Sequence, residues 1–234
     1  IMYEYLKDCS YENVIYAETF ISPDHAAECG ISYDDMISGC VEGIDDAEND
    51  FGIIGRIIVT CVRHLGPKQG IDVAQQMVDN PHPYIVGFGM GGDELAFTLK
   101  DFAPAFNIAS NANYPCTVHA GEICGPESVW DAINHLPISR IGHGVKSIED
   151  CELLNTLVKR NIHLEISPGS NLALSLYPNW SNHPLKLIML KGISISLNSD
   201  DPPFFNTSVG LEYQNSAKHF NFGIEELKSI SLMA

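Results

Sequence analysis

The sequence predicts an α/β fold built from repeating strand–helix units, and three observations support this fold class. Short runs rich in β-branched residues alternate with segments whose apolar residues recur every three or four positions. The seven strand candidates begin about 30 residues apart on average, which is the length of one strand and its crossover helix. Polar residues follow directly after nearly every candidate strand. The predicted strands begin at Val14, Arg56, Tyr84, Cys116, Ser139, Ile162 and Ile193.

The segments between these strands have the spacing of amphipathic helices. Pro126 is placed to occupy the first turn of one helix, and Gly192 is placed to follow the last turn of another, directly before the next strand. These start and stop signals agree with the apolar periodicity. The helical spacing is found over residues 1–9, 37–44, 129–136, 153–158 and 224–234.

Alternating βα units either close into an eight-stranded barrel or remain an open, doubly wound sheet. A doubly wound nucleotide-binding sheet usually has a glycine-rich turn after its first strand, whereas here polar residues recur at the ends of many strands. Catalytic groups at many strand ends are typical of a barrel, so we predict a TIM-type (β/α)8 barrel. The residues that follow the strands are His64, Gly91, Gly92, His119 to Glu122, His143, Ser167 and Asn198 to Asp201.

The domain organisation predicted for residues 1–234 is a single barrel domain, because no linker or change of composition divides the chain. Seven strands are one fewer than a barrel needs, so the first strand is predicted to precede Ile1 and to be missing from this chain. The chain also begins and ends within predicted helices. We therefore expect the domain to be incomplete at both its N-terminus and its C-terminus.

The composition excludes several classes of partner. Thirteen Lys and Arg residues against 30 Asp and Glu residues give a formal net charge of −17, which repels phosphate backbones and anionic membranes. The sequence contains neither the roughly 18 consecutive apolar residues of a membrane span nor a secretory leader. We expect a cytoplasmic protein that binds a small molecule, with no nucleic-acid or membrane partner.

Three motifs carry the groups that can do chemistry. In TVHAGE, a strand delivers the imidazole of His119, and the carboxylate of Glu122 follows after two small residues. In RIGHG, His143 ends a strand between two glycines, which indicates an imidazole in a tight pocket. In SLNSDDPP, the adjacent carboxylates of Asp200 and Asp201 repel each other unless a cation or a proton separates their roles. Imidazoles and carboxylates together indicate metal binding and acid–base catalysis.

In this order on βα units, TVHAGE, RIGHG and SLNSDDP resemble the motifs of the adenosine deaminase family, including its bacterial members. The stretches YAETFISPDHA, VGFGMGGDE, GPESVWDAI and SPGSN extend the likeness over nearly the whole chain. The resemblance implies a zinc-dependent barrel that hydrolyses the 6-amino group of adenosine or 2'-deoxyadenosine. The products would be inosine or 2'-deoxyinosine, and ammonia.

The resemblance also implies the metal ligands. His119 and Asp200 match ligands of one zinc ion per subunit, and the family takes two further ligands from a His-x-His motif on its first strand. This sequence contains no His-x-His. Catalytic zinc needs at least three protein ligands and a water molecule, so we expect this chain by itself to bind zinc poorly, with the two further histidines supplied by the missing strand.

The remaining roles follow from the same resemblance. Glu122 would give a proton to N1 of the purine, and His143 would orient and polarise the attacking water. Asp201 would bond ring N7, and the backbone N–H of Gly92 would bond ring N3. Gly89 stands where many relatives have aspartate, which changes the contacts of that loop.

Two alternatives to an adenosine deaminase remain open at this point. One is a deaminase of adenine or another 6-aminopurine, although the glycine before His143 resembles the adenosine branch and the adenine branch tends to have aspartate there. The other is a catalytically inactive relative that only binds a nucleoside. The sequence does not determine the oligomeric state.

Overall fold

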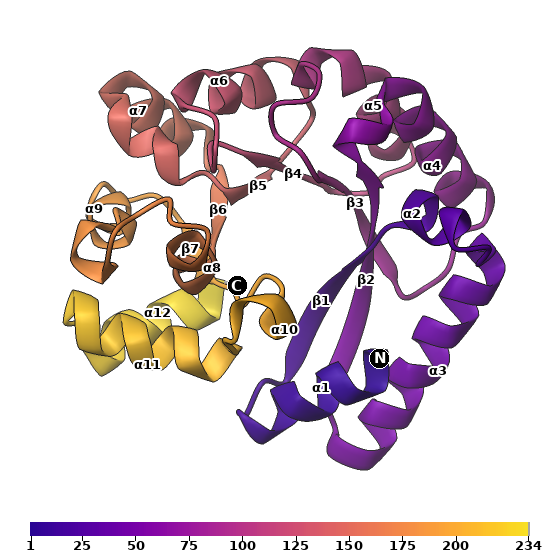
Figure 1. Cartoon of the computed structure of the whole chain (residues 1–234), viewed down its shortest axis with the longest axis horizontal. Coiled ribbons are helices and arrows are strands. Elements are labelled where there is room, and N and C mark those ends of the chain that lie inside the picture. The colour runs from indigo at the N-terminus through magenta and orange to yellow at the C-terminus, as the bar shows by residue number, and fades with distance from the viewer. Residues whose placement is uncertain (234) are drawn as a thin grey trace. The chain divides into compact units, whose positions relative to one another are not determined.

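Strands and helices alternate along the chain from α1 (Met2–Tyr11) to α12 (Ile224–Met233), as predicted (Figure 1). The structure, a computed structural model, describes residues 1–233. Two compact units make up the chain. Unit 1 comprises Ile1–Thr117 and His135–Pro137, and unit 2 comprises Val118–Asn134 and the described chain from Ile138 onward.

All seven predicted strands are present within residues 1–233. Most apolar side chains of β2 to β7 are buried, as expected for strands that are covered by helices, whereas in β1 only Ile21 is buried. Strand β4 contributes residues to both units. The strands are β1 (Tyr16–Ile21), β2 (Ile54–Val62), β3 (Ile85–Gly91), β4 (Cys116–Ala120), β5 (Arg140–His143), β6 (His163–Ile166) and β7 (Ile195–Leu197).

In unit 1, β1, β2 and β3 pair in chain order and in parallel. The pairing of β1 with β2 begins at Tyr16 opposite Ile54, and the pairing of β2 with β3 has an irregularity between Ile57 and Ile58. Parallel neighbours need crossover connections, which the intervening helices supply. The further helices of this unit are α2 (Pro23–Glu28), α3 (Tyr33–Phe51), α4 (Pro67–Asp79) and α5 (Ala103–Asn111).

The helices of unit 1 pack closely on its strands. A side chain at Gly55 of β2 would approach Ile44 of α3 and Leu6 of α1 to within 2.9 Å, so only glycine fits there. On β3, the ring of Phe88 lies edge-on to Phe106 of α5, with their centroids 5.2 Å apart. Fully buried aromatic and aliphatic residues of this kind provide most of the hydrophobic stabilisation.

In unit 2, β5, β6 and β7 also pair in chain order and in parallel. Leu164 lies at the centre of this sheet, opposite Ile141 on one side and Ile195 on the other. The helices of this unit are α6 (Pro126–His135), whose last residue belongs to unit 1, α7 (Cys151–Arg160), α8 (Pro168–Ala173), α9 (Leu185–Leu190), α10 (Pro202–Phe205), α11 (Val209–Phe220) and α12.

The helix signals read from the sequence are confirmed. Helix α6 begins at Pro126. Gly192 follows α9 with a φ of 84°, and its N–H donates a hydrogen bond to the carbonyl of Met189, which satisfies one of the last carbonyls of the helix. The two terminal segments predicted as helices are α1 and α12.

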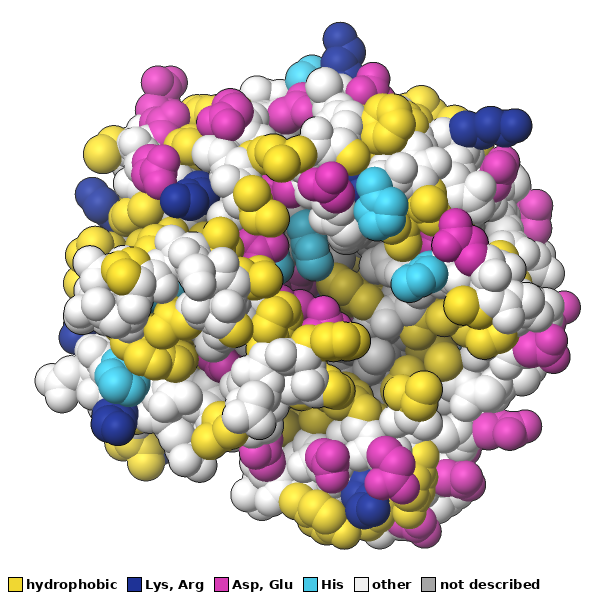
Figure 2. Space-filling view, viewed as in Figure 1, with side chains coloured by type: hydrophobic (Ala, Val, Ile, Leu, Met, Phe, Trp, Pro, Cys, Tyr) yellow, Lys and Arg dark blue, Asp and Glu magenta, His cyan; other side chains and the backbone are white. Residues whose placement is uncertain are grey.

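The predicted single domain, with a missing first strand and incomplete ends, stays a prediction. No helix within residues 1–233 is long and apolar enough to cross a membrane. Acidic side chains outnumber lysine and arginine on the face that Figure 2 shows, in keeping with the net charge of −17.

Candidate functional site

The ends of three strands in unit 2 carry the predicted catalytic and metal-binding side chains. His119 lies near the end of β4, and Glu122 follows two residues after that strand. His143 is the last residue of β5, and Asp200 lies three residues beyond β7. The carboxyl ends of parallel strands meet at one edge of a sheet, so this arrangement gathers the four side chains.

Two of these residues have an unusual backbone conformation. His143 has a φ of 63° and Asp200 a φ of 56°, both in the left-handed region. For a residue with a side chain, this conformation costs on the order of 1–3 kcal/mol and persists only where the surrounding structure maintains it. The strained backbone lies at the two positions that aim an imidazole and a carboxylate at each other.

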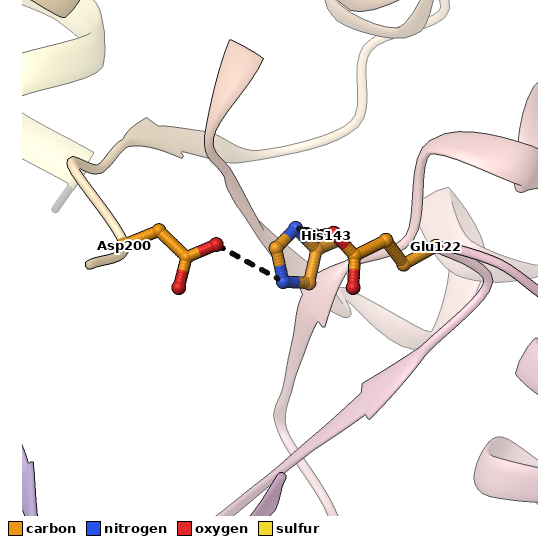
Figure 3. Close-up of side chains that lie close together, drawn as sticks. All are labelled: Glu122, His143 and Asp200. Atoms are coloured by element: carbon orange, nitrogen blue, oxygen red, sulfur yellow. Dashed lines mark ion pairs between the residues drawn. The ribbon is translucent and has the colours of Figure 1, made fainter. Parts of the chain in front are cut away.

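The imidazole of His143 lies between two carboxylates (Figure 3). Its Nδ1 is 3.4 Å from Oε1 of Glu122, and its Nε2 is 3.8 Å from Oδ2 of Asp200. The side chain of His143 is 4% exposed, that of Glu122 12% and that of Asp200 18%. A site so far removed from water strengthens every electrostatic interaction within it.

Helix α8 supplies two buried side chains that bind this group. Asn171 Nδ2 donates a hydrogen bond to Oε1 of Glu122 at 3.1 Å and lies 3.3 Å from Nδ1 of His143. Ser170 donates its hydroxyl hydrogen to Oδ2 of Asp200 at 2.7 Å. The three central side chains, those of Glu122, His143 and Asp200, therefore each have a partner on α8.

A second histidine lies behind Asn171. His183 Nε2 is 3.1 Å from Oδ1 of Asn171, and its Nδ1 accepts a hydrogen bond from the backbone N–H of Leu185 at 3.2 Å. Burial, and then the proximity of His143, lower the pKa of His183 to about 3. The ring is therefore neutral at physiological pH.

His119 lies against the His143 ring, edge to face, with their centroids 4.9 Å apart. A side chain at Gly142 would meet the His119 ring, including Nε2 at 3.0 Å. Desolvation, followed by the charge of Asp200, raises the pKa of Asp201, while His119 acts in the opposite direction. His119 is thus close enough to both acidic and imidazole groups to take part in the same site.

The structure places Gly92 in unit 1, directly after β3. Its φ is 95°, and a side chain there would come within 3.1 Å of Nδ1 of His64. At Gly89, also in unit 1, a Cβ would lie 2.8 Å from Cγ2 of Thr60, which explains why aspartate does not fit there without a shift. The contact predicted between Gly92 and a purine stays a prediction.

Three residues of the site were missed by the sequence analysis. SPGSN was noted as part of the family likeness, but Ser170 and Asn171 received no role. His183 lies outside the three motifs, and nothing in the local pattern connects it to them. Asn171 is 49 residues from Glu122 in the chain. A hydrogen bond between residues so far apart in sequence produces no periodic pattern from which it could be predicted.

The central side chains also match the requirements of a metal site. Among residues 1–233, Glu122, His143 and Asp200 offer ligand atoms that all lie within 4.8 Å of one another. Carboxylate oxygens and imidazole nitrogens are ligands that zinc takes in proteins. Of these three residues, the sequence analysis predicted only Asp200 as a metal ligand, and it assigned Glu122 and His143 to catalysis.

The sequence profile of the adenosine deaminase family matches residues 1–234. The chain belongs to the adenosine deaminase family. It is 45% identical to an adenine deaminase of Agrobacterium fabrum over 230 residues, which are 98% of this chain and 71% of that relative. It is 41% identical to an adenine deaminase of Rhizobium leguminosarum bv. trifolii over the same shares of the two chains.

Solved structures of family relatives have the same fold. An adenine deaminase from Arthrobacter aurescens superposes with a TM-score of 0.94 at 24% identity, covering 99% of this chain and 71% of that one. An amidohydrolase from Burkholderia ambifaria with bound zinc gives a TM-score of 0.93 at 29% identity, covering 99% and 65%. These similarities confirm the predicted α/β barrel class.

Proposed function

We propose that this chain catalyses the metal-dependent hydrolytic deamination of a 6-aminopurine, with adenine as the preferred substrate. The observation that carries the proposal is the convergence of Glu122, His143 and Asp200 within 4.8 Å at strand ends of a family member. Deamination replaces the 6-amino group by oxygen from water, so adenine would give hypoxanthine and ammonia. Such a reaction needs an activated water and a proton donor for the ring.

The metal we propose is zinc, for which Asp200 and His119 would supply two of the ligands. The donor chemistry fits, because Asp200 offers a carboxylate that is 18% exposed and the His119 imidazole lies against the neighbouring His143 ring. When bound, zinc would lower the pKa of a water molecule, which makes a nucleophile available at neutral pH. The neighbouring relative with bound zinc supports this choice of ion.

Glu122 is proposed as the acid that protonates ring N1. Its carboxyl group is largely buried and accepts a hydrogen bond from Asn171, which holds it in one orientation. Attack at C6 places negative charge on the ring, and a proton delivered to N1 neutralises that charge as it develops. A fixed carboxyl group contributes without the reorganisation that a mobile one would require.

His143 and Asp201 are proposed to orient the reactants. Nε2 of His143 faces Asp200, so the ring can direct a water molecule held on that side. Asp201, whose pKa is raised by desolvation, can share a hydrogen bond with N7 of the purine. The two adjacent aspartates then have different roles, one toward the metal and one toward the substrate.

The identity of the preferred purine is supported by the relatives, which are named adenine deaminases at 37–45% identity. One feature favours adenosine instead. Gly142 precedes His143, and the close approach of the His119 ring leaves no space for a side chain at this position. A glycine here resembles the adenosine branch of the family, so adenosine is the second candidate.

The proposal is tested by incubating the zinc-loaded protein with adenine and adenosine separately and together, and by measuring ammonia release and the purine products. We expect adenine to be consumed with the higher kcat/KM. Preferential formation of inosine would favour the second candidate. Absence of ammonia from either purine would contradict the proposed function.

A further inference from the structure

We propose that His183 and Asn171 are positioning residues that hold Nδ1 of the His143 ring as a hydrogen-bond acceptor and so direct the ring hydrogen to Nε2. The inference rests on the deaminase function proposed above. It follows from the hydrogen-bond partners of one buried series of groups, which begins at the backbone of α9 and ends at the ring of His143. Each group in this series restricts the hydrogen positions of the next.

The first restriction is at His183. Its Nδ1 accepts the backbone N–H of Leu185, the first residue of α9, where amides lack partners within the helix. A ring nitrogen that accepts a hydrogen bond carries no hydrogen, so the hydrogen of the neutral ring lies on Nε2. His183 Nε2 therefore donates to Oδ1 of Asn171, 3.1 Å away.

The second restriction is at Asn171. An amide has one acceptor oxygen and two N–H donors, and the oxygen is already directed toward His183. The donor nitrogen consequently faces Glu122 Oε1 at 3.1 Å and His143 Nδ1 at 3.3 Å. Asn171 is fully buried, so it has no water to replace a lost partner. Reversing its amide would place the amide oxygen against the Glu122 carboxylate, acceptor against acceptor, and the amide nitrogen against the N–H of His183, donor against donor.

The third restriction is at His143. With Nδ1 accepting from Asn171, the hydrogen of the neutral ring lies on Nε2. Nε2 faces Asp200, so the hydrogen is directed to the side of the site where water attack is proposed. The competing arrangement places a hydrogen on Nδ1 and directs it to Oε1 of Glu122 at 3.4 Å. That arrangement would bring the hydrogen against an N–H of Asn171.

A fixed hydrogen position has a catalytic consequence. If the hydrogen were on Nδ1, the ring would present a bare nitrogen toward Asp200 and would not donate to a water or substrate oxygen there. Residues that orient the ligands of a metal site from behind typically contribute about 10- to 100-fold to activity, and we expect an effect of similar size for residues that orient His143. His183 and Asn171 thus act through His143 and not on the purine.

The hydrogen position can be measured without turnover. Long-range proton–nitrogen NMR correlations of the metal-free protein report which ring nitrogen is protonated, and loss of a signal in His143→Gln assigns it. We expect the wild-type His143 ring to carry its hydrogen on Nε2. In Asn171→Asp, which replaces the donor by an acceptor, we expect the hydrogen to move to Nδ1. A wild-type ring with its hydrogen on Nδ1 would overturn the inference.

Two variants of His183 distinguish the contribution of its hydrogen bonds from the contribution of its packing. His183→Gln keeps one acceptor for Leu185 and one donor for Asn171, whereas His183→Leu keeps neither. In the zinc-loaded protein, we expect His183→Leu to lower kcat about 10- to 100-fold with little change in KM, and His183→Gln to recover most of the loss. Equal loss in both variants would overturn the role of His183.

A matched control is His163→Gln, because His163 is a half-buried histidine that also has partners at both nitrogens, Ser194 and Ser196. We expect it to lower stability and leave the His143 spectrum unchanged. A changed spectrum in this control would overturn the specific link through Asn171. Wild-type protein that has the expected hydrogen position but deaminates no purine would contradict the proposed function and leave the hydrogen placement intact.

Discussion

The side chains of the candidate site have different proposed tasks although they lie within a few ångströms of one another. Glu122 and Asp200 are both acids beside the same imidazole, and each has its own partner on α8. The partners differ in kind, because Asn171 is an amide that also contacts His143 whereas Ser170 contacts Asp200 alone among the three central residues. Substitutions that remove one task at a time are therefore informative.

Glu122→Gln tests the proposed proton donor. The amide keeps the size of the side chain and an oxygen that can accept from Asn171, but it cannot give up a proton as a carboxylic acid does. We expect kcat to fall by roughly 100- to 10,000-fold, with zinc content and the unfolding midpoint nearly unchanged. Steady-state kinetics and metal analysis of the purified variant check this. Retention of wild-type kcat would exclude Glu122 as the acid.

Gly142→Ala tests the packing of the His119 ring. The added methyl group would overlap that ring, which must then turn away from His143. We expect a loss of about 1–3 kcal/mol in the free energy of unfolding, together with weaker zinc binding. Urea unfolding and zinc titration measure the two effects. Gly39→Ala serves as a control for zinc binding, because Gly39 lies in α3 and has open space around its Cβ position.

At the scale of elements, the pairing of β6 with β7 has a built-in dependence on pH. His163 of β6 hydrogen-bonds Ser194 and Ser196 at its two ring nitrogens, 2.7 and 3.0 Å away. Burial, and then the charge of Arg140, lower the pKa of His163 to about 4. The folded protein thus holds this ring neutral at a pH where the unfolded chain protonates it.

The sign of the effect follows from proton linkage. Below pH about 6.5 the unfolded chain binds a proton at this residue that the folded protein does not bind, so stability is full above that pH and falls toward pH 4. At pH 5 the loss is about 2 kcal/mol. Urea unfolding at pH 7 and pH 5 should therefore show a smaller fall in His163→Gln than in wild type. His219→Gln, which changes an exposed histidine, should lose as much stability between pH 7 and pH 5 as wild type does. An identical loss in all three proteins would show that His163 is not the source of the pH dependence.

The elements themselves were largely predictable. All seven strands lie where β-branched runs such as RIIVTCV and CTVHA were found, because such runs favour buried parallel strands. The helices with capping signals were also predictable, as Pro126 and Gly192 show. Short helices such as α2 and α8 were not, because six residues are too few to display an apolar period.

The site was predictable to the extent that it follows strand ends. His119, Glu122, His143 and Asp200 could be named because each stands at or just after a β-rich run. Asn171 and His183 could not, since their partners are defined by how α8 and the segment before α9 pack in three dimensions. The left-handed backbone of His143 and Asp200 also left no sequence signal, since neither residue is glycine.

At the scale of the whole molecule, the candidate metal site lies in only one of the two units. Every side chain of the Glu122, His143 and Asp200 group, and each of its partners on α8, belongs to unit 2. Unit 1 has its own core and carries Gly92. Ligand effects that begin at the candidate metal site should therefore appear first in unit 2.

Hydrogen exchange with and without excess zinc tests this expectation. Zinc binds the folded protein and so stabilises it, and we expect slower exchange in the segments that end β4 and β5 and follow β7. Asp200→Asn should abolish the response, because it removes a proposed ligand. Glu225→Gln, which alters an exposed carboxylate of α12 paired with Lys228, should preserve it. A full response in Asp200→Asn would contradict the proposed metal site.

Under the proposed mechanism, the hydrogen bond from Leu185 to His183 would make the start of α9 contribute to catalysis without any contact with substrate. His183 provides the acceptor that this first turn requires and, with its other nitrogen, holds Asn171 still. A displacement of α9 would therefore change the position of the hydrogen on the His143 ring. Binders or crosslinks that shift this helix from the protein surface offer a means of tuning turnover from a distance.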